Sequence, residues 1–444
     1  MKDRYRFDAV LVLNRFYQEK TGFLEDFYNH VLTQNPYLPR ERSLLVGLIR
    51  GTIKARPYLD VVLRSYLPRW GKLPSPIQNL LRLALFQLIF HSGIPVFATV
   101  HEWVEVAKNL KPGGFVSLVN AVLRRMAEKI SVYREEALQW GVTLPEWVES
   151  EWADLFPQEK EAIKRSFMLP PETYIRVNIL RIEKNDLQIE LAKKGIQTEE
   201  VPSVPCALRV LDDYSTLLAL PEFERGFFYP QDLGSQMVVE IFRPSAGERI
   251  IDLCCGVGGK STAFAQMMGD GGEIIAWDWD FSKIETLKKF ASRMGIKSIH
   301  PAVVDVLNPP GEFAGSADRV FLDAPCSGLG TARRHPEVLE RLQEEQVRIL
   351  AKKQLEMLLS ASRLVKRNGI ILYCVCTLTV EETEEVTYGF EKMKGKEFQR
   401  VSWSEMGLGK EGFPFLQKVR SGGIFILPHY LGSDGFFVMA WKRE

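Results

Sequence analysis

Apolar residues return at helical spacing throughout the first 130 residues of the chain. The pattern is clearest in four stretches, residues 43–53, 77–89, 99–109 and 115–125. Apolar positions three or four apart form one stripe along a helix, and such a stripe is normally buried against other helices. Prolines separate these stretches from one another. The sequence therefore predicts an N-terminal all-α bundle.

The pattern changes near residue 173, where short apolar runs replace the long helical ones. Three of these runs predict strands, residues 174–178, 198–201 and 208–211. An amphipathic helix is predicted at residues 184–194. This β-α-β order is typical of a compact α+β module of the ferredoxin-like or RRM-like kind. We place its end near residues 228–231.

Strands and helices alternate regularly from residue 249 onward. The predicted strands are residues 249–254, 273–277, 300–304, 319–322 and 369–375. The predicted helices are residues 259–268, 282–294 and 340–364, and a closing hairpin is predicted at 424–441. This alternation is typical of an α/β, Rossmann-like domain built on a doubly wound parallel sheet. The chain is thus predicted to be multidomain, with limits at residues 1–132, 133–230 and 231–444.

Charge divides the chain in the same place as the pattern does. Residues 1–130 hold 19 Lys and Arg against 10 Asp and Glu, a net charge of +9. The whole chain carries +1, so the remaining residues carry −8. A basic module joined to an acidic one is typical of an arm that binds a polyanion and carries an enzyme; a solvated basic surface is the alternative. We expect nucleic acid as the partner of the helical bundle.

Composition indicates the class and compartment of the protein. Apolar residues make up 46% of the chain and charged residues 25%, as in soluble globular proteins. We see no apolar run long enough for a membrane span, and no apolar signal-peptide core in the first residues. The six cysteines show no disulfide framework. We therefore expect a cytoplasmic protein that has no membrane partner and keeps its cysteines as thiols.

The turn after the first Rossmann-like strand is rich in glycine. It reads Asp252-Leu-Cys-Cys-Gly-Val-Gly-Gly-Lys260, and glycine lets a backbone approach a ligand closely. The alternative is structural, because tight turns between a strand and a helix often need glycine in any case. The candidate cofactor-binding residues of this turn are Cys254, Cys255, Gly256, Val257, Gly258, Gly259 and Lys260.

Three aspartates follow strands of the same predicted sheet and can share the crevice at its carboxyl edge. Asp278 stands where Rossmann-like folds place the acid that binds a ribose. Asp305 suits an adenine amino group, with an ordinary exposed acid as the alternative. Asp323 could hydrogen-bond the ring nitrogen and exocyclic amine of a cytosine. We predict that Asp278 and Asp305 help to bind the cofactor and that Asp323 contacts the substrate base.

Two cysteines close predicted strands of this sheet. If residues 319–322 and 369–375 are neighbouring parallel strands, Cys326 and Cys376 project into one crevice. A cysteine acts as a nucleophile in its thiolate form, which a depressed pKa of the thiol favours, so this pairing indicates covalent chemistry. The alternative for Cys326 is a small buried apolar side chain. Cys374 is expected to pack inside. No cysteine or histidine spacing suits a tetrahedral metal site, so no metal is predicted.

Several of these segments together resemble the RNA cytosine-C5 methyltransferases that use S-adenosylmethionine. They are residues 252–260, residues 323–328 with Arg333-Arg-His-Pro336, and the strand ending Tyr373-Cys-Val-Cys376. Residues 231–236 resemble the segment before the catalytic domain, and the N-terminal helices resemble a NusB-like RNA-binding domain. A NusB-like arm on this catalytic domain resembles the RsmB/Sun (Fmu) family over nearly the whole chain.

The resemblance implies a covalent mechanism. Cys376 would add to C6 of a cytosine and so activate C5, Asp323 would stabilise the developing charge at N3, and Cys326 would serve product release. The implied cofactor is S-adenosylmethionine, held by residues 254–260 with Asp278, Asp305 and the catalytic Asp323. The implied partner is 16S rRNA, protein-free or in an early assembly state, with the target base outside any stack. We expect a monomer.

The sequence departs from the family pattern at two positions. Val257 stands where a proline is usual, which could loosen the cofactor turn. Val375 stands in place of a threonine whose hydroxyl could lie near the nucleophile. Two alternatives stay open: the same chemistry on tRNA or 23S rRNA, and a catalytically silent RNA-binding assembly factor. An amino-methyltransferase and a dehydrogenase are disfavoured, because their sequence motifs are absent.

Overall fold

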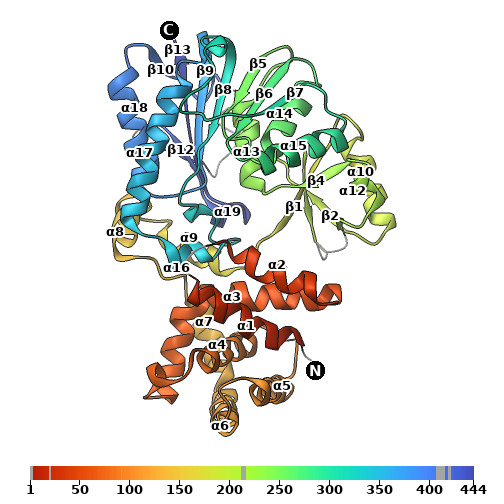
Figure 1. Cartoon of the computed structure of the whole chain (residues 1–444), viewed down its shortest axis with the longest axis vertical. Helices are drawn as coiled ribbons and strands as arrows, with labels where there is room; N and C mark the ends of the chain where they lie inside the picture. The colour runs from red at the N-terminus through yellow and green to blue at the C-terminus, as the bar shows by residue number, and fades with distance from the viewer. Residues whose placement is uncertain (1–3, 20–21, 92, 212–216, 407–415, 419–421) are drawn as a thin grey trace. The chain divides into compact units, whose positions relative to one another are not determined.

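A computed structural model of the chain describes residues 4–19, 22–91, 93–211, 217–406, 416–418 and 422–444. The chain forms two compact units (Figure 1). The helical unit comprises Met1–Pro170 with Ala332–Arg341, and the sheet unit comprises Pro171–Thr331 with Leu342–Glu444. In the part of the chain just defined, no helix is both long and apolar enough to cross a membrane.

The helical unit confirms the all-α prediction for the N-terminal part. Its helices are α1 (Arg4–Gln18), α2 (Leu24–Gln34), α3 (Pro39–Tyr66), α4 (Ser75–Phe90), α5 (Val96–Asn109), α6 (Val116–Ala127), α7 (Ile130–Gln139), α8 (Glu146–Leu155), α9 (Lys160–Met168) and α16 (Glu337–Arg341), with a short 3-10 turn at η1 (Trp70–Lys72). The four that the apolar stretches predicted, α3, α4, α5 and α6, extend beyond those stretches at one or both ends.

Helix α4 lies in the middle of this unit because it is apolar on nearly every side. Its fully buried residues include Leu80, Leu81, Leu83, Ala84 and Leu85. Gln87, also buried in α4, accepts hydrogen bonds at Oε1 from Arg6 Nε (3.1 Å) and from Trp103 Nε1 (2.8 Å). One buried amide therefore connects α4 to α1 and α5, in addition to the apolar contacts.

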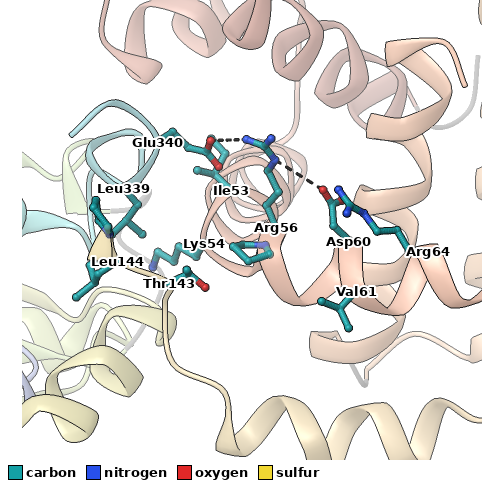
Figure 2. A pocket seen from close by; sticks show the side chains of 12 residues that line it. Ile53, Lys54, Arg56, Asp60, Val61, Arg64, Thr143, Leu144, Leu339 and Glu340 are labelled. Carbon is teal, nitrogen blue, oxygen red and sulfur yellow. Dashed lines mark hydrogen bonds and ion pairs between the residues drawn. The ribbon is translucent and has the colours of Figure 1, made fainter. Parts of the chain in front are cut away.

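Helix α16 belongs to the helical unit although it follows β8 in the sequence. Arg56 of α3 forms an ion pair with Glu340 of α16 and lies 4.0 Å from Asp60 (Figure 2). The guanidinium of Arg341 lies 4.5 Å from the ring centroid of Phe16. A pocket of about 410 Å³ lies between α3, residues 143–145 and α16. Its charged side chains are already paired in large part, as Figure 2 shows for Arg56.

The first part of the sheet unit is the predicted ferredoxin-like module. Its antiparallel sheet has the order β2-β3-β1-β4, with β1 (Thr173–Val177), β2 (Thr198–Glu200), β3 (Ala207–Val210) and β4 (Phe228–Pro230). Helices α10 (Lys184–Lys193) and α12 (Pro221–Glu224) join them. Residues 228–230, where the sequence suggested only a boundary, form β4 and pair with β1.

The second part of the sheet unit confirms the predicted Rossmann-like architecture. Its sheet has the order β11-β12-β13-β9-β8-β5-β6-β7, with β10 paired to β13 (Figure 1). The strands are β5 (Arg249–Asp252), β6 (Glu273–Asp278), β7 (Ile299–Val303), β8 (Ala317–Asp323), β9 (Val365–Val375), β10 (Phe398–Arg400), β11 (Leu416–Lys418), β12 (Ile424–Ile426) and β13 (Phe436–Arg443). The helices are α13 (Leu233–Phe242), α14 (Gly259–Met267), α15 (Phe281–Met294), α17 (Glu344–Ala361), α18 (Val386–Lys394) and α19 (Pro428–Leu431), with short turns at η2 (Gly311–Phe313), η3 (Leu329–Thr331) and η4 (Glu381–Glu385).

The central strands are parallel and buried on both faces. β5 pairs in parallel with β6 and β8, and β8 pairs in parallel with β9. On one face Phe321 of β8 packs against Phe242 of α13 and Phe264 of α14, with ring centroids 5.1 and 4.9 Å away. On the other face Tyr373 of β9 hydrogen-bonds Gln354 of α17. Burial on both faces explains why these strands read as continuous apolar runs.

Two features differ from the sequence prediction. The helix predicted at residues 340–364 is two helices, α16 and α17, because the chain is extended at Gln343 (φ −130°, ψ 130°). The predicted closing hairpin is the antiparallel pair β12 and β13, but α19 lies between its strands. The domain limits at 1–132, 133–230 and 231–444 stay predictions.

Candidate active site

The candidate site lies where the carboxyl ends of β5, β6, β8 and β9 meet at one edge of the sheet. From β5 the chain continues to β6 and β7 on one side, and then returns to β8 and β9 on the other. The helical connections therefore diverge between β5 and β8. Open α/β sheets bind ligands at such a switch point. The residues that the sequence singled out follow these strands.

The glycine-rich turn is folded back onto the end of β6. Cys255 N donates to the carbonyl of Trp277 (2.9 Å), and Gly256 N donates to Asp278 Oδ2 (3.0 Å). Gly256 has φ +55°, and a Cβ built there would meet nothing within 4 Å. The backbone at Gly256 is thus held in place by β6, and the space on the side where a Cβ would lie is open.

Position 258 requires glycine because its backbone lies close to α15. It has φ +91°, and a Cβ at this position would lie 2.0 Å from Leu287 Cδ1. The next carbonyl, that of Gly259, accepts hydrogen bonds from Tyr229 Oη and Gln231 Nε2, both at 3.1 Å. Residues that precede the Rossmann-like domain in the sequence therefore support the glycine turn from the other side.

The two candidate acids on β6 and β7 have different surroundings. Asp278 is 4% exposed and accepts Gly256 N at Oδ2 and Asp280 N at Oδ1, both at 3.0 Å. Asp305 is exposed and accepts hydrogen bonds from Leu307 N and Asn308 Nδ2 within its own loop. These two bonds, the Asn308 amide first, lower the pKa of Asp305 below its ordinary value. Asp278 is part of the glycine turn's framework, whereas Asp305 shapes the loop after β7.

Asp323, at the end of β8, is paired with Lys260 of the glycine turn. Lys260 Nζ lies 2.6 Å from Asp323 Oδ2, and the two side chains are 15% and 25% exposed. Burial alone would lower the pKa of Lys260, but the negative groups around it, Asp323 first, together raise that pKa. Lys260 Nζ also lies 5.3 Å from the ring centroid of Phe436. A residue predicted to bind cofactor thus contacts the predicted catalytic acid directly.

The two candidate cysteines are in contact. Cys326 Sγ and Cys376 Sγ are 3.3 Å apart, and both side chains are partly exposed free thiols. The parallel pairing of β8 with β9 brings them together, because it sets Asp323 opposite Cys374. Cys374 itself is fully buried, as predicted, and its Sγ lies 3.4 Å from Asp323 Oδ1.

The pKa of the Cys326 thiol is raised well above its ordinary value. The hydrogen bond with Cys376 contributes most, followed by burial of the sulfur. Two sulfurs at 3.3 Å cannot both carry a negative charge without strong repulsion. At most one sulfur of the pair is therefore a thiolate at a time, and a thiolate is the form of cysteine that acts as a nucleophile.

A buried polar cluster around Glu382 was missed by the sequence reasoning. Glu382 lies in η4, six positions after Cys376, and has no exposed surface. It accepts hydrogen bonds from Ser327, Gln354 and Thr379. In the sequence, residues 381–385 read as an ordinary acidic helix start. The short spacing from Cys376 was the one available signal, and it does not distinguish a buried glutamate from an exposed one.

Two further residues can be placed. Arg333, in the segment that resembles the methyltransferase family, is buried in the helical unit and donates from Nε to the carbonyl of Pro170 (2.9 Å). Asp252, at the end of β5, is 1% exposed and accepts from Ser261 Oγ (2.6 Å). Among the residues that the structure describes, no group of three or more His, Cys, Asp and Glu side chains is placed to hold a metal ion.

Comparisons with known families cover most of the chain. Residues 4–128 match the NusB family, residues 144–216 match the ferredoxin-like domain of RsmF/B-like methyltransferases, and residues 239–442 match the family described as 16S rRNA methyltransferase RsmB/F. Among solved structures, the crystal structure of PH0851 is 24% identical with a TM-score of 0.76, over 99% of this chain and 98% of that chain. NSun6 from Pyrococcus horikoshii with SFG is 22% identical with a TM-score of 0.56, over 68% of this chain and 98% of that chain. At these identities the two structures support the fold alone.

Curated relatives match over nearly their full length. The probable ribosomal RNA small subunit methyltransferase B of Bacillus subtilis is 32% identical over 423 residues, which are 93% of each chain. The ribosomal RNA small subunit methyltransferase B of Thermus thermophilus is 29% identical, over 96% of this chain and 94% of that protein. Identity of this level across all three parts of the chain shows common descent of the whole protein. The chain therefore belongs to the RsmB/F family of 16S rRNA methyltransferases.

Proposed function

We propose that this protein transfers a methyl group from S-adenosylmethionine to C5 of a cytosine in small-subunit ribosomal RNA, through a covalent bond between Cys376 and the base. The observation that carries the proposal is the contact between Cys376 and Cys326, with sulfurs 3.3 Å apart, beside the Asp323–Lys260 ion pair. Two thiols and a charged pair at one sheet edge suit addition to a planar base. Membership of the family supports the methyl donor and the RNA substrate.

The glycine turn fits an adenosyl group. Gly256 leaves open space above its backbone, and each Asp278 oxygen accepts one N–H and retains a lone pair for a ribose hydroxyl. Residues 254–260, with Asp278, Asp305 and Asp323, are the proposed cofactor contacts. S-adenosylmethionine bound there would supply the methyl group as an electrophile on a sulfonium.

Asp323 and Lys260 are proposed to bind the face of the base that pairs in a duplex. As the carboxylate of an ion pair, Asp323 can only accept hydrogen bonds, so it suits the exocyclic amine of cytosine. Lys260 has three donors and uses one on Asp323. A second can reach toward ring nitrogen N3, where charge develops when sulfur adds to C6. The sequence expected Asp323 alone to serve both positions.

Cys376 is the proposed nucleophile and Cys326 the residue that assists release. The Cys376 thiolate forms a bond to C6, and C5 then carries electron density. With S-adenosylmethionine bound, C5 would form a bond to the methyl carbon while the bond from that carbon to the sulfonium sulfur breaks and leaves a neutral thioether. A base removes the C5 proton, the C5–C6 double bond re-forms, and the bond from C6 to Cys376 sulfur breaks. The leaving sulfur is in contact with Cys326, which holds a proton.

The substrate is proposed from the family and from charge. We infer 16S rRNA with a 967-type cytosine as the target, in the cytoplasm and either protein-free or in an early assembly state. The net charge of +9 on residues 1–130 supports an RNA-binding arm. The same chemistry on tRNA or 23S rRNA is the second candidate.

The test uses protein-free 16S, 23S and tRNA with methyl-labelled cofactor, and compares wild type with Cys376→Ala and Cys326→Ala. We expect label in 16S rRNA with wild type, and no label with Cys376→Ala. Cys326→Ala should accumulate a denaturation-resistant complex of protein and RNA, because release is impaired. Equal labelling by all three proteins would exclude the cysteine roles, and label in tRNA alone would move the substrate.

A further inference from the structure

We propose that Glu382 is a positioning residue. It fixes the Cys326 loop (residues 324–331) against the Cys376 loop (residues 376–380). The inference rests on the proposed covalent mechanism, because it explains how two thiols on separate strands are kept in contact. Glu382 lies in η4, is fully buried, and touches neither sulfur. It acts through the residues that follow each cysteine.

The carboxylate holds the Cys326 loop by two bonds to one residue. Ser327 N donates to Glu382 Oε1 (2.8 Å), and Ser327 Oγ lies in hydrogen-bond contact with Oε2. Gln354 Nε2 of α17 also donates to Oε1 (2.9 Å) and to the carbonyl of Pro325 (2.9 Å). The residues before and after Cys326 are thus both tied to this buried group.

The same group holds the Cys376 loop through a directed chain of hydroxyls. A carboxylate only accepts, so Ser327 Oγ must use its one proton on Glu382 Oε2. The contact between Ser327 Oγ and Thr377 Oγ1 (2.8 Å) is therefore donated by Thr377. Thr379 Oγ1 also donates to Oε2 (2.9 Å). Thr377, directly after Cys376, is in this way connected to the Cys326 loop by side chains.

The backbone of η4 adds a third support. Tyr373 Oη, three residues before Cys376, lies 2.7 Å from the carbonyl oxygen of Glu382 and 3.0 Å from Gln354 Oε1, and these two acceptors share its one proton. Every hydrogen bond that the Glu382 carboxylate accepts in the described structure comes from a neutral donor. These donors therefore do not neutralise its negative charge. That charge contributes, after the Cys376 hydrogen bond and burial, to the raised pKa of Cys326.

The consequence for the reaction is geometric and electrostatic at once. Nucleophilic addition needs the attacking sulfur within a fraction of an ångström of its productive position, and a misplacement of about 1 Å can cost on the order of 100-fold in rate. Gln at 382 keeps the shape of Glu but replaces one accepting oxygen by an NH₂ group. At the Oε1 position that group would face two N–H donors, which cannot accept from it. At the Oε2 position the hydroxyls of Ser327 and Thr379 would have to turn and accept from it. Either way the bonds to a charged carboxylate are lost, so the contact between the two loops is weakened.

The test measures how readily the two thiols are cross-linked to each other and, separately, the rate of methyl transfer. The variants are Glu382→Gln, Ser327→Ala and, as a matched control, Glu385→Gln, an exposed glutamate at the end of the same turn. Dibromobimane reports the pair, because it becomes fluorescent once both of its carbon–bromine bonds have been replaced by bonds to sulfur, with loss of two bromides and two protons. Cys326→Ala gives the background from other thiols. Methyl transfer is measured as kcat and as KM for S-adenosylmethionine.

We expect Glu382→Gln to slow cross-linking of the pair and to lower kcat by about 10- to 100-fold, with KM for S-adenosylmethionine unchanged. Ser327→Ala should give a smaller loss of both, and Glu385→Gln neither. Wild-type cross-linking and kcat in a folded Glu382→Gln would overturn the proposal. If Glu382→Gln does not fold, Ser327→Ala decides in the same way. If wild type shows no methyl transfer at all, the proposed function fails while the cross-linking result still decides the role of Glu382.

Discussion

Replacing Asp252 by asparagine should remove a pH dependence from the stability of the sheet unit. Asp252 ends β5 with 1% of its surface exposed. Burial, opposed in part by the hydrogen bond from Ser261, raises its pKa from 3.8 to about 7. The charged carboxylate is therefore unfavourable in the folded protein at pH values where it is readily solvated in the unfolded chain.

The sign and size of the effect follow from the two pKa values. Below pH 3.8 both states hold the proton, and above about 7 both have lost it. Between these values only the folded state holds it, so stability falls as pH rises through the interval and then levels off. One pH unit corresponds to about 1.4 kcal/mol, so the part of the interval above about pH 5.5 carries on the order of 2 kcal/mol.

The assay is hydrogen exchange at the β5 amides, corrected for the intrinsic pH dependence of exchange, because a chain with two units does not unfold in one step. Wild type should lose stability between about pH 5.5 and 7, whereas Asp252→Asn should stay nearly constant and be the more stable protein at about pH 8. Asp305→Asn is the control: the pKa of Asp305 is lowered, so its contribution changes only below pH 3.8. Parallel curves for wild type and Asp252→Asn would refute the reasoning.

Three other predictions concern packing and charge. Gly51→Ala should destabilise the helical unit by about 1–3 kcal/mol, because its Cβ would lie 1.9 Å from Phe86 Cζ. In the same helix, a Cβ at Gly47 would meet nothing within 4 Å, so Gly47→Ala should stabilise the unit by about 0.5–1 kcal/mol; thermal unfolding compares the two variants. Lys260→Met should abolish methyl transfer and lower the free energy of unfolding, because it leaves Asp323 without its cation. Removing one partner of a fully buried pair costs roughly 3–5 kcal/mol, and the loss here should be somewhat smaller because Asp323 is 25% exposed; urea unfolding measures it. Gly258→Ala should weaken S-adenosylmethionine binding more than Gly256→Ala in calorimetry, since only the first places a Cβ against Leu287.

The sequence predicts the fold well where burial is uniform. β5, β8 and β9 are buried on both faces, so their residues form apolar runs that can be read without ambiguity. Strands with weaker signals were missed. β4 and β10 have three residues each, and they exist because a neighbouring strand supplies their hydrogen bonds. Such pairing is a property of the tertiary structure and leaves little trace in local composition.

The candidate site divides along the same line. Cys326, Cys376 and Asp278 could be found because each follows a strong strand of a recognisable sheet. The partners that hold them could not. Glu382 and Gln354 are polar residues in helical turns, and their burial depends on how η4 and α17 pack behind β9. The pairing of Lys260 with Asp323 likewise joins residues 63 positions apart.

The placement of α16 bears on what the helical unit is for. Residues 332–341 follow the Cys326 loop directly, yet they pack in the helical unit: Arg333 donates to the carbonyl of Pro170, Glu340 pairs with Arg56, and Arg341 lies over Phe16. On the other side of Thr331, Gly330 N donates to the carbonyl of Cys376 (3.0 Å). One continuous stretch of chain thus runs from the partner of the proposed nucleophile into the helical unit. A protein without residues 1–170 would lose every contact just named for 332–341, with the proposed catalytic residues still present. The helical unit therefore includes a segment that directly follows the Cys326 loop in the sequence.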